Sequence, residues 1–346
     1  PTSLPSRLLD RDVERWLELV SASGFSVWQV LPLGEPQGGL SPYQCISAFA
    51  MNPALLGDFP PLDKTVPEYI EFCASNHEWL YDYTLFKVLK QMYDDAPWFE
   101  WPDEWKYRQP HAMQRAFHDF KDYVAELSWD QFQLFTRWRE IKRKANDRGI
   151  KLFGDIPLFV AHDSVDVWAH PEQFLLDEKG MMTVVTGVPP DYYSETGQRW
   201  GNPHYNWEVM RQENYAWWLS RINHHLQEFD LLRIDHFRGL ESSWVIDAAC
   251  ETAVDGYWQQ MPGDELLTRI NQDAGHLPIV AEDLGIITPE VTALRRKHNL
   301  PGMSVLQFGF DEHEDNPHKP QNITQDSVVY TGTHDNDTTK GWYQGF

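Results

Sequence analysis

The chain has 346 residues, of which 42% are hydrophobic, so it is long enough to bury a large core, and its length is compatible with a single domain that carries insertions. Its net charge of −23 argues against nucleic acid or an anionic membrane as a partner, because their phosphates would be repelled. A neutral polymer would be neither attracted nor repelled by this negative charge.

The three cysteines, Cys45, Cys73 and Cys250, show no C-x-x-C spacing. The sequence also shows no signal peptide and no apolar run long enough to span a bilayer. These features are typical of a cytoplasmic protein with reduced thiols, and we expect no membrane partner.

Short apolar strands alternate with longer amphipathic segments along the chain, which is typical of a parallel α/β protein. The predicted strands are Val27–Leu33, Lys151–Ile156, Leu231–Asp235, Ile279–Glu282, Val305–Phe308 and Val328–Thr331. Between the first two lies a tryptophan-rich segment of about 50–148, with helical periodicity in 78–94 and 114–148. We expect that segment to be largely helical.

The third predicted strand carries Arg233 and Asp235 two residues apart, so both side chains point to the same side. A permanently charged arginine should hold the aspartate ionised, as a carboxylate nucleophile requires. Taken alone, an arginine and an aspartate at this spacing are more often a structural ion pair.

Two further strands end in acidic residues. Glu282 follows the apolar run 277–281, and His334 and Asp335 follow the run 327–331. Three buried strands that each present carboxylates at the C-terminal end are typical of the catalytic face of a (β/α)₈ barrel. Two carboxylates are sufficient to cleave a glycosidic bond, so Asp235 and Glu282 are the candidate pair.

Six motifs in chain order carry a resemblance to a known family. They occupy residues 1–6, 28–33 (WQVLPL), 41–44 (SPYQ), 154–157 (GDIP), 187–203 (GVPPDYYSETGQRWGNP) and 334–339 (HDNDTT). With these motifs the chain resembles the 4-α-glucanotransferases (amylomaltases, or disproportionating enzymes) of glycoside hydrolase family 77 in the α-amylase clan.

The resemblance implies a (β/α)₈ TIM barrel over residues 1–346, with the helical segment of about 50–148 as a subdomain on a barrel loop. Family members carry a strand before the segment matching residues 1–5 and continue beyond the segment matching 338–339. We therefore expect an incomplete barrel that lacks its first and eighth strands.

The resemblance also implies roles for individual residues. Asp235 would be the nucleophile, Glu282 the general acid/base and Asp335 the residue that holds sugar hydroxyls and stabilises the transition state. Arg233 would orient Asp235, and His334 would hydrogen-bond the sugar. The residues implied to line the glucan groove are Tyr43, Tyr192, Tyr193, Gln198, Trp200 and Asn202. Asp155 would be a polar neighbour of the cluster, with a capping or ion-pairing role as the alternative to substrate contact.

The implied reaction is transfer of α-1,4-glucan segments between maltooligosaccharides, with retention of configuration. It needs no cofactor, and the sequence has no H-E-x-x-H or comparable metal-ligand spacing. Segment 189–203 is the candidate for holding the acceptor sugar. Two alternatives stay open at this point, an α-glucan hydrolase of the same clan and a noncatalytic glucan-binding fragment.

Overall fold

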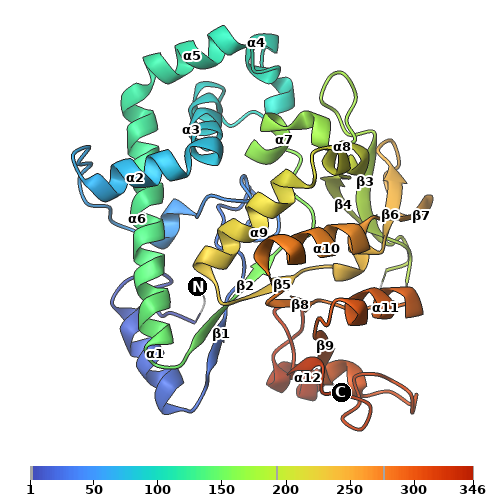
Figure 1. The fold of residues 1–346 in the computed structure, drawn as a ribbon. Helices are drawn as coiled ribbons and strands as arrows, with labels where there is room; N and C mark the ends of the chain where they lie inside the picture. Colours follow the sequence, from blue (N-terminus) through green and yellow to red (C-terminus); the bar gives the residue numbers. More distant parts are fainter. Residues whose placement is uncertain (1–2, 192–193, 276, 346) are drawn as a thin grey trace.

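A computed structural model of the chain describes residues 3–191, 194–275 and 277–345 (Figure 1). At its centre is a parallel four-stranded sheet in the order β1-β2-β5-β8. The strands are β1 (Val27–Gln29), β2 (Lys151–Ile156), β5 (Leu231–Ile234) and β8 (Ile279–Ala281). Each of these strands overlaps a strand predicted from the sequence.

A second parallel pair, β9 (Gly302–Val305) and β10 (Ser327–Tyr330), continues this arrangement. The N–H of Ala281 at the end of β8 donates to the carbonyl of Pro301, 2.8 Å away, just before β9. The Tyr330 hydroxyl donates to Oε1 of Gln29 on β1, also at 2.8 Å. The six parallel strands therefore curve round so that the last lies near the first, as in an α/β barrel.

The predicted strand Val305–Phe308 is wrong by three residues. The strand is Gly302–Val305, and residues Leu306–Gly309 form the 3-10 helix η5. Hydrophobic residues occur on both sides of Val305, so the contacts of the segment fix the boundary of the strand. The N–H of Met303 donates to Oδ1 of Asp283 at 2.7 Å, and a Cβ on Gly302 would lie 2.5 Å from the other oxygen of that carboxylate. Glycine is thus required where the strand begins.

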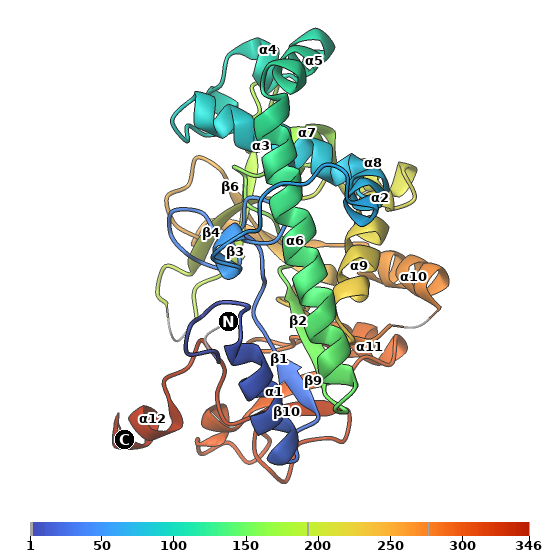
Figure 2. The same ribbon diagram turned by 90° about the vertical axis from the view of Figure 1, so that its left-hand side faces the viewer.

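Between β1 and β2, the described residues first form a loop with one isolated bridge, Pro36–Cys45, and the regular elements after it are all helices. These are η1 (Pro53–Leu55), α2 (Pro67–Ser75), α3 (His77–Met92), η2 (Trp98–Glu100), α4 (Asp103–Lys106), α5 (Pro110–Asp119) and α6 (Lys121–Asn146). The helical periodicity predicted over 114–148 thus belongs to two helices. Figure 2 shows α6 extending along much of the molecule beside α1 (Asp12–Ala22) and β2. It buries Leu134, Trp138 and Ile141, which are spaced as one helix face.

Most tryptophans of this helical segment belong to the core, as their spacing predicts. Trp98, Trp101, Trp105, Trp129 and Trp138 are buried. Trp79 on α3 is only partly buried, and its ring packs against Phe49 and His224.

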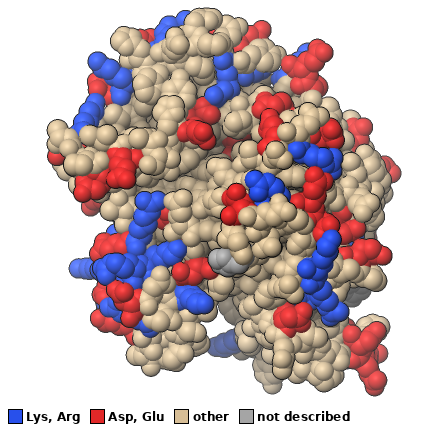
Figure 3. Space-filling view, in the orientation of Figure 1, with Lys and Arg blue, Asp and Glu red and all other residues tan. Residues whose placement is uncertain are grey.

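The remaining helices follow β2. They are α7 (Val165–Ala169), η3 (Pro171–Gln173), α8 (Trp207–Gln212), α9 (Ala216–Glu228), η4 (Phe237–Leu240), α10 (Gly263–Ala274), α11 (Pro289–Lys297) and α12 (Thr339–Gly345). Within the described ranges, none of the helices has the length and apolar character needed to cross a bilayer. Acidic and basic side chains are interspersed over the face in Figure 3.

The sequence did not predict the antiparallel sheet of order β4-β3-β6-β7. Its strands are β3 (Val184–Val188), β4 (Gln198–Pro203), β6 (Ser242–Asp247) and β7 (Gly256–Gln260). A Cβ on Gly187 would lie 2.1 Å from the carbonyl oxygen of Gln198, so this glycine allows β3 and β4 to pair closely. The second part of segment 189–203 is strand β4 of this sheet, where it pairs with β3.

Candidate active site

A cavity of about 1080 Å³ lies where the C-terminal ends of β5 and β8 meet the loops that follow them. It brings together most of the residues that the sequence singled out. Those lining it are Tyr43, Gln198, Trp200, Asn202, Arg233, Asp235, Glu282 and Asp335. Tyr192 and Tyr193 lie outside the described residues.

Asp235 is the first residue after β5, and its backbone N–H donates to the carbonyl of Ile156 at 2.9 Å. Arg233 Nη2 lies 2.8 Å from Oδ1 of Asp235, as the same-side spacing predicts. Burial raises the pKa of Asp235 to about 6, while Arg233 opposes this rise. The carboxylate thus stays charged at neutral pH, but burial outweighs the arginine, contrary to the simple expectation from sequence.

Glu282 follows β8 and is held by two backbone donors. Its Oε2 accepts from the N–H of His236 at 2.7 Å, and its Oε1 accepts from the N–H of Leu284 at 3.0 Å. His236 has a left-handed backbone conformation (φ 53°), which is uncommon for a residue other than glycine. The backbone is thus unusual at the residue whose N–H donates to Glu282. Burial, and then the charge of Asp235, raise the pKa of Glu282 to about 7. A carboxyl with this pKa can carry a proton near neutral pH.

Asp155, near the end of β2, is buried and contacts both Arg233 and Tyr43. Its side chain is 1% exposed, and both of its oxygens lie 2.8 Å from Nη1 of Arg233. The Tyr43 hydroxyl donates to Oδ2 of Asp155 at 2.7 Å and lies 3.1 Å from Nε2 of His334, whose ring stacks on that of Tyr43. The structure thus favours the ion-pairing role for Asp155, with Tyr43 and His334 arranged above it.

Replacing Asp155 with asparagine tests this positioning role. We expect kcat for glucan transfer to fall by about 10- to 100-fold, because Arg233 and Tyr43 lose their common charged partner. The charge of Asp155 also raises the pKa of Asp235, so the acidic limb of the pH–rate profile should move to lower pH. A merely structural residue would leave that limb in place. Asp166→Asn is the matched control, since Asp166 is another buried aspartate but lies outside this cluster.

Asp335 lies at the mouth of the cavity, where its side chain is 74% exposed. Its Oδ1 is 3.2 Å from Nε2 of His334, and its N–H donates to Oγ1 of Thr333 at 3.3 Å. Asp335 is therefore the most accessible of the three acids, and its role in holding sugar hydroxyls stays a prediction.

The segment after residue 197 forms one wall of the cavity. Trp200 meets the ring of His236 edge to face, with centroids 4.7 Å apart, and its Nε1 donates to Oε1 of Gln198 at 3.1 Å. Asn202 is buried, donates to the carbonyl of Val160 at 2.8 Å and accepts from Nε2 of Gln44 at 2.9 Å. Its amide thus holds two segments together, and its contact with the substrate stays a prediction.

Sequence analysis missed a second wall. Lining residues after β8 and β9 include Ile286, Phe308, Asp311, Asn316 and His318. Asn316 Nδ2 donates to the carbonyl of Phe308 at 2.8 Å and to Oδ2 of Asp311 at 2.7 Å, which folds this loop against the cavity. In barrel enzymes the active site is built from the loops that follow the strands. This rule could have predicted that the loops after β8 and β9 line the cavity.

Comparison with known proteins shows the family of this chain. A family model described as 4-alpha-glucanotransferase matches residues 1–59 and 58–345. The chain belongs to the 4-alpha-glucanotransferase family. It is 44% identical to the 4-alpha-glucanotransferase of Thermus thermophilus over 393 aligned positions, which cover 99% of this chain and 78% of the relative. Identity to the Synechocystis sp. 4-alpha-glucanotransferase is 43%, over 99% of this chain and 79% of that protein.

Solved structures agree with the family assignment. An amylomaltase from Streptococcus agalactiae, solved in complex with acarbose, superposes with a TM-score of 0.91 at 31% identity, covering 97% of this chain and 77% of that one. The amylomaltase from Corynebacterium glutamicum shares the fold, with a TM-score of 0.78 at 16% identity over 96% of this chain and 53% of that one. The predicted α/β fold with a parallel sheet is thereby confirmed.

The 393 aligned positions exceed the 346 residues of this chain, so the Thermus relative contains segments with no counterpart here. The two parts of the family match meet at residues 58–59. In this 4-alpha-glucanotransferase family member, residues 58–59 lie in the connection between η1 and α2.

Proposed function

We propose that this chain is a retaining 4-α-glucanotransferase that moves α-1,4-glucan segments between maltooligosaccharides through a covalent glucosyl-enzyme. The observation that carries the proposal is one cavity in which Asp235, charged and paired with Arg233, faces the same space as Glu282, whose pKa is raised to about 7. Two carboxyls with different protonation states are what this chemistry requires.

In the first step Glu282 donates its proton to the glycosidic oxygen while an oxygen of Asp235 attacks C1 of the donor sugar. The C1–O4 bond breaks, the leaving glucan departs with the proton, and an Asp235–C1 ester forms. In the second step Glu282, now ionised, takes the proton from the 4-hydroxyl of an acceptor glucan as that oxygen attacks C1. The ester breaks, the α-1,4 bond is remade and Glu282 is protonated again.

Arg233 and Asp155 act on this reaction through Asp235. Because Arg233 contacts both aspartates, it fixes the attacking carboxylate relative to the sheet. We propose that His334, Asp335 and Tyr43 bind hydroxyls of the sugar at the cleavage point, and that Trp200 offers it an apolar face.

The three cysteines are unpaired in the structure, which suits a reducing compartment. We accordingly propose a cytoplasmic enzyme that acts on maltodextrins.

Incubation with maltotriose tests the proposal against hydrolysis. Transfer should yield glucose together with maltooligosaccharides longer than three units, while the total concentration of reducing ends stays constant, because each bond broken is remade. A steady rise in reducing ends without longer products would show that water is the acceptor. The absence of any product would instead favour a noncatalytic glucan-binding protein.

A further inference from the structure

The loop after β8 begins at Glu282 and borders the catalytic cavity. Leu284, Gly285 and Ile286, which we call the 284–286 loop, line that cavity, and the N–H of Leu284 is one of the two donors to Glu282. We propose that Arg238 is a positioning residue of the active site, which fixes this loop and thereby the orientation of the Glu282 carboxyl. The inference deepens the proposed function and rests on it for the role of Glu282 as acid/base.

Arg238 reaches this loop from the neighbouring strand. It lies on η4, after β5, and its Nη1 donates to the carbonyl of Ile286. The 284–286 loop is therefore held at both of its ends, because the N–H of Leu284 contacts the carboxylate and the carbonyl of Ile286 contacts the guanidinium. Gly285 between them has a left-handed backbone (φ 86°), so the chain turns between these two contacts.

An indole ring packs against the same guanidinium. Cζ of Arg238 lies 3.8 Å from the ring centroid of Trp258 on β7, a cation–π contact. Trp258 is paired with Trp244 on β6, and the two rings meet edge to face with centroids 5.2 Å apart. The antiparallel sheet is thus linked through Arg238 to the loop that contacts Glu282.

Burial of Arg238 costs free energy that an apolar side chain would not. The residue is 7% exposed, and its buried Nε has no hydrogen-bond partner. Burial also lowers the pKa of its guanidinium. Apolar residues of similar size can often replace a buried charge without loss of stability. The contacts with Ile286 and Trp258 therefore favour a role for Arg238 in placing the loop.

The effect of losing this contact can be measured at Glu282. Backbone hydrogen bonds from His236 and Leu284 lower the pKa of Glu282, against the rise caused by burial and by the charge of Asp235. When the loop is no longer held, the hydrogen bond from Leu284 weakens and the pKa rises further. Asp235 and Arg233, the charged groups that act on this carboxyl from β5, stay in place.

Arg238→Lys tests the proposal, because lysine keeps the charge but cannot both donate to Ile286 and cover the indole of Trp258. We expect kcat for maltotriose to fall by about 10-fold, since a misplaced acid protonates the leaving glucan less efficiently. The alkaline limb of the pH–rate profile should move to higher pH by about one pH unit, because Glu282 keeps its proton longer. The acidic limb, set by Asp235, should not move.

Trp258→Leu weakens the same contact from the side of the sheet and leaves Arg238 itself intact. Trp258 is 39% exposed, so the fold should tolerate leucine there. The alkaline limb should again move to higher pH, but by less, because the hydrogen bond to Ile286 is kept and loses only its support. Trp258→Phe restores an aromatic face and should restore the wild-type limb.

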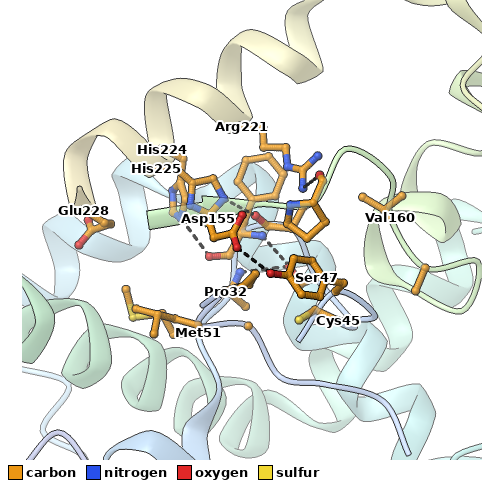
Figure 4. A pocket seen from close by; sticks show the side chains of 18 of the residues that line it. Pro32, Cys45, Ser47, Met51, Asp155, Val160, Arg221, His224, His225 and Glu228 are labelled. Carbon is orange, nitrogen blue, oxygen red and sulfur yellow. Dashed lines mark hydrogen bonds between the residues drawn. The ribbon is translucent and has the colours of Figure 1, made fainter. Parts of the chain in front are cut away.

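Arg221→Lys is the matched control. Figure 4 shows Arg221 on α9, beside a small cavity on the other side of β2 from Glu282. Arg221 is also buried, its Nη2 donates to the carbonyl of Pro157 at 2.7 Å, and its guanidinium packs against two tryptophan rings of α9. Its replacement should lower the melting temperature about as much as Arg238→Lys does. The alkaline limb should stay in place, because the carbonyl that Arg221 holds follows β2 and not β8.

A titration without substrate separates this inference from the proposed function. In protein labelled with ¹³C at the glutamate carboxyl carbon, the signal missing from Glu282→Gln identifies Glu282. Its titration midpoint should move to higher pH in Arg238→Lys and in Trp258→Leu. An unchanged midpoint, or an equal shift in Arg221→Lys, would overturn the positioning role. A shifted midpoint in a protein that transfers no glucan would contradict the proposed function and leave the positioning of Glu282 by Arg238 standing.

Discussion

Asp235→Asn should lower transfer from maltotriose by on the order of 10⁴-fold and change the dissociation constant for maltoheptaose by only a few-fold. The amide has the shape of the carboxylate and can still accept from Arg233, which lies 2.8 Å from Oδ1 in the wild type. It lacks the negative charge with which the nucleophile attacks C1. Steady-state kinetics and calorimetry on the same preparation measure both quantities.

Asp283→Asn is the control for this experiment. Asp283 is also an aspartate at the end of a barrel strand, but it contacts Nε of Arg295 at 3.0 Å and the N–H of Met303. Its replacement should lower the melting temperature more than kcat. A 2-deoxy-2-fluoro glucosyl fluoride should trap a covalent adduct on Asp235. Labelling of Asp335 or Asp283 in its place would refute the assignment of the nucleophile.

Glu282→Gln should lower kcat for maltotriose by about 10³-fold, because the leaving glucan loses its proton donor. In the wild type, activity should fall below about pH 6 as Asp235 takes a proton and above about pH 7 as Glu282 loses one. These two values belong to the interacting pair. The variant should lose the alkaline limb. An α-maltosyl fluoride donor, whose leaving group needs no proton, should restore formation of the glucosyl-enzyme.

The same substitution has a consequence for stability. Burial raises the pKa of Glu282 from 4.5 to about 7 in the folded state, so the folded protein holds this proton more tightly than the unfolded chain. The resulting stabilisation is complete below about pH 4.5 and is lost as the pH rises to about 7. Glutamine does not titrate. The melting temperature of Glu282→Gln relative to wild type should therefore increase from pH 5 to pH 8, and a constant difference between the two would show that burial does not shift this group.

Some features of the active site follow from residues that are neighbours in the sequence, and others depend on contacts between distant segments. Strand alternation is local, so the sequence could place Arg233 and Asp235 on one side of β5. The two backbone N–H groups that hold Glu282 come from His236, after β5, and Leu284, after β8. The first contact exists only because β5 and β8 pair. The assignment of residues of about 50–148 to a helical subdomain on a barrel loop stays a prediction.

The sequence by itself determined the parallel α/β class and the positions of five of the six barrel strands. It also determined that acidic residues lie at the C-terminal ends of these strands. Hydrophobic runs and side-chain alternation depend only on residues that are close together in the sequence, so they can be recognised without the structure. Only the tertiary structure decided that Asp155 lies beside Arg233 on the neighbouring strand and that Asn202 makes internal hydrogen bonds. It also decided that β9 begins at Gly302 and that an antiparallel sheet supports the cavity wall. Each of these depends on strand register or on a contact between residues far apart in the chain. Such contacts form only when distant segments bury their shared surface, and no local pattern encodes them.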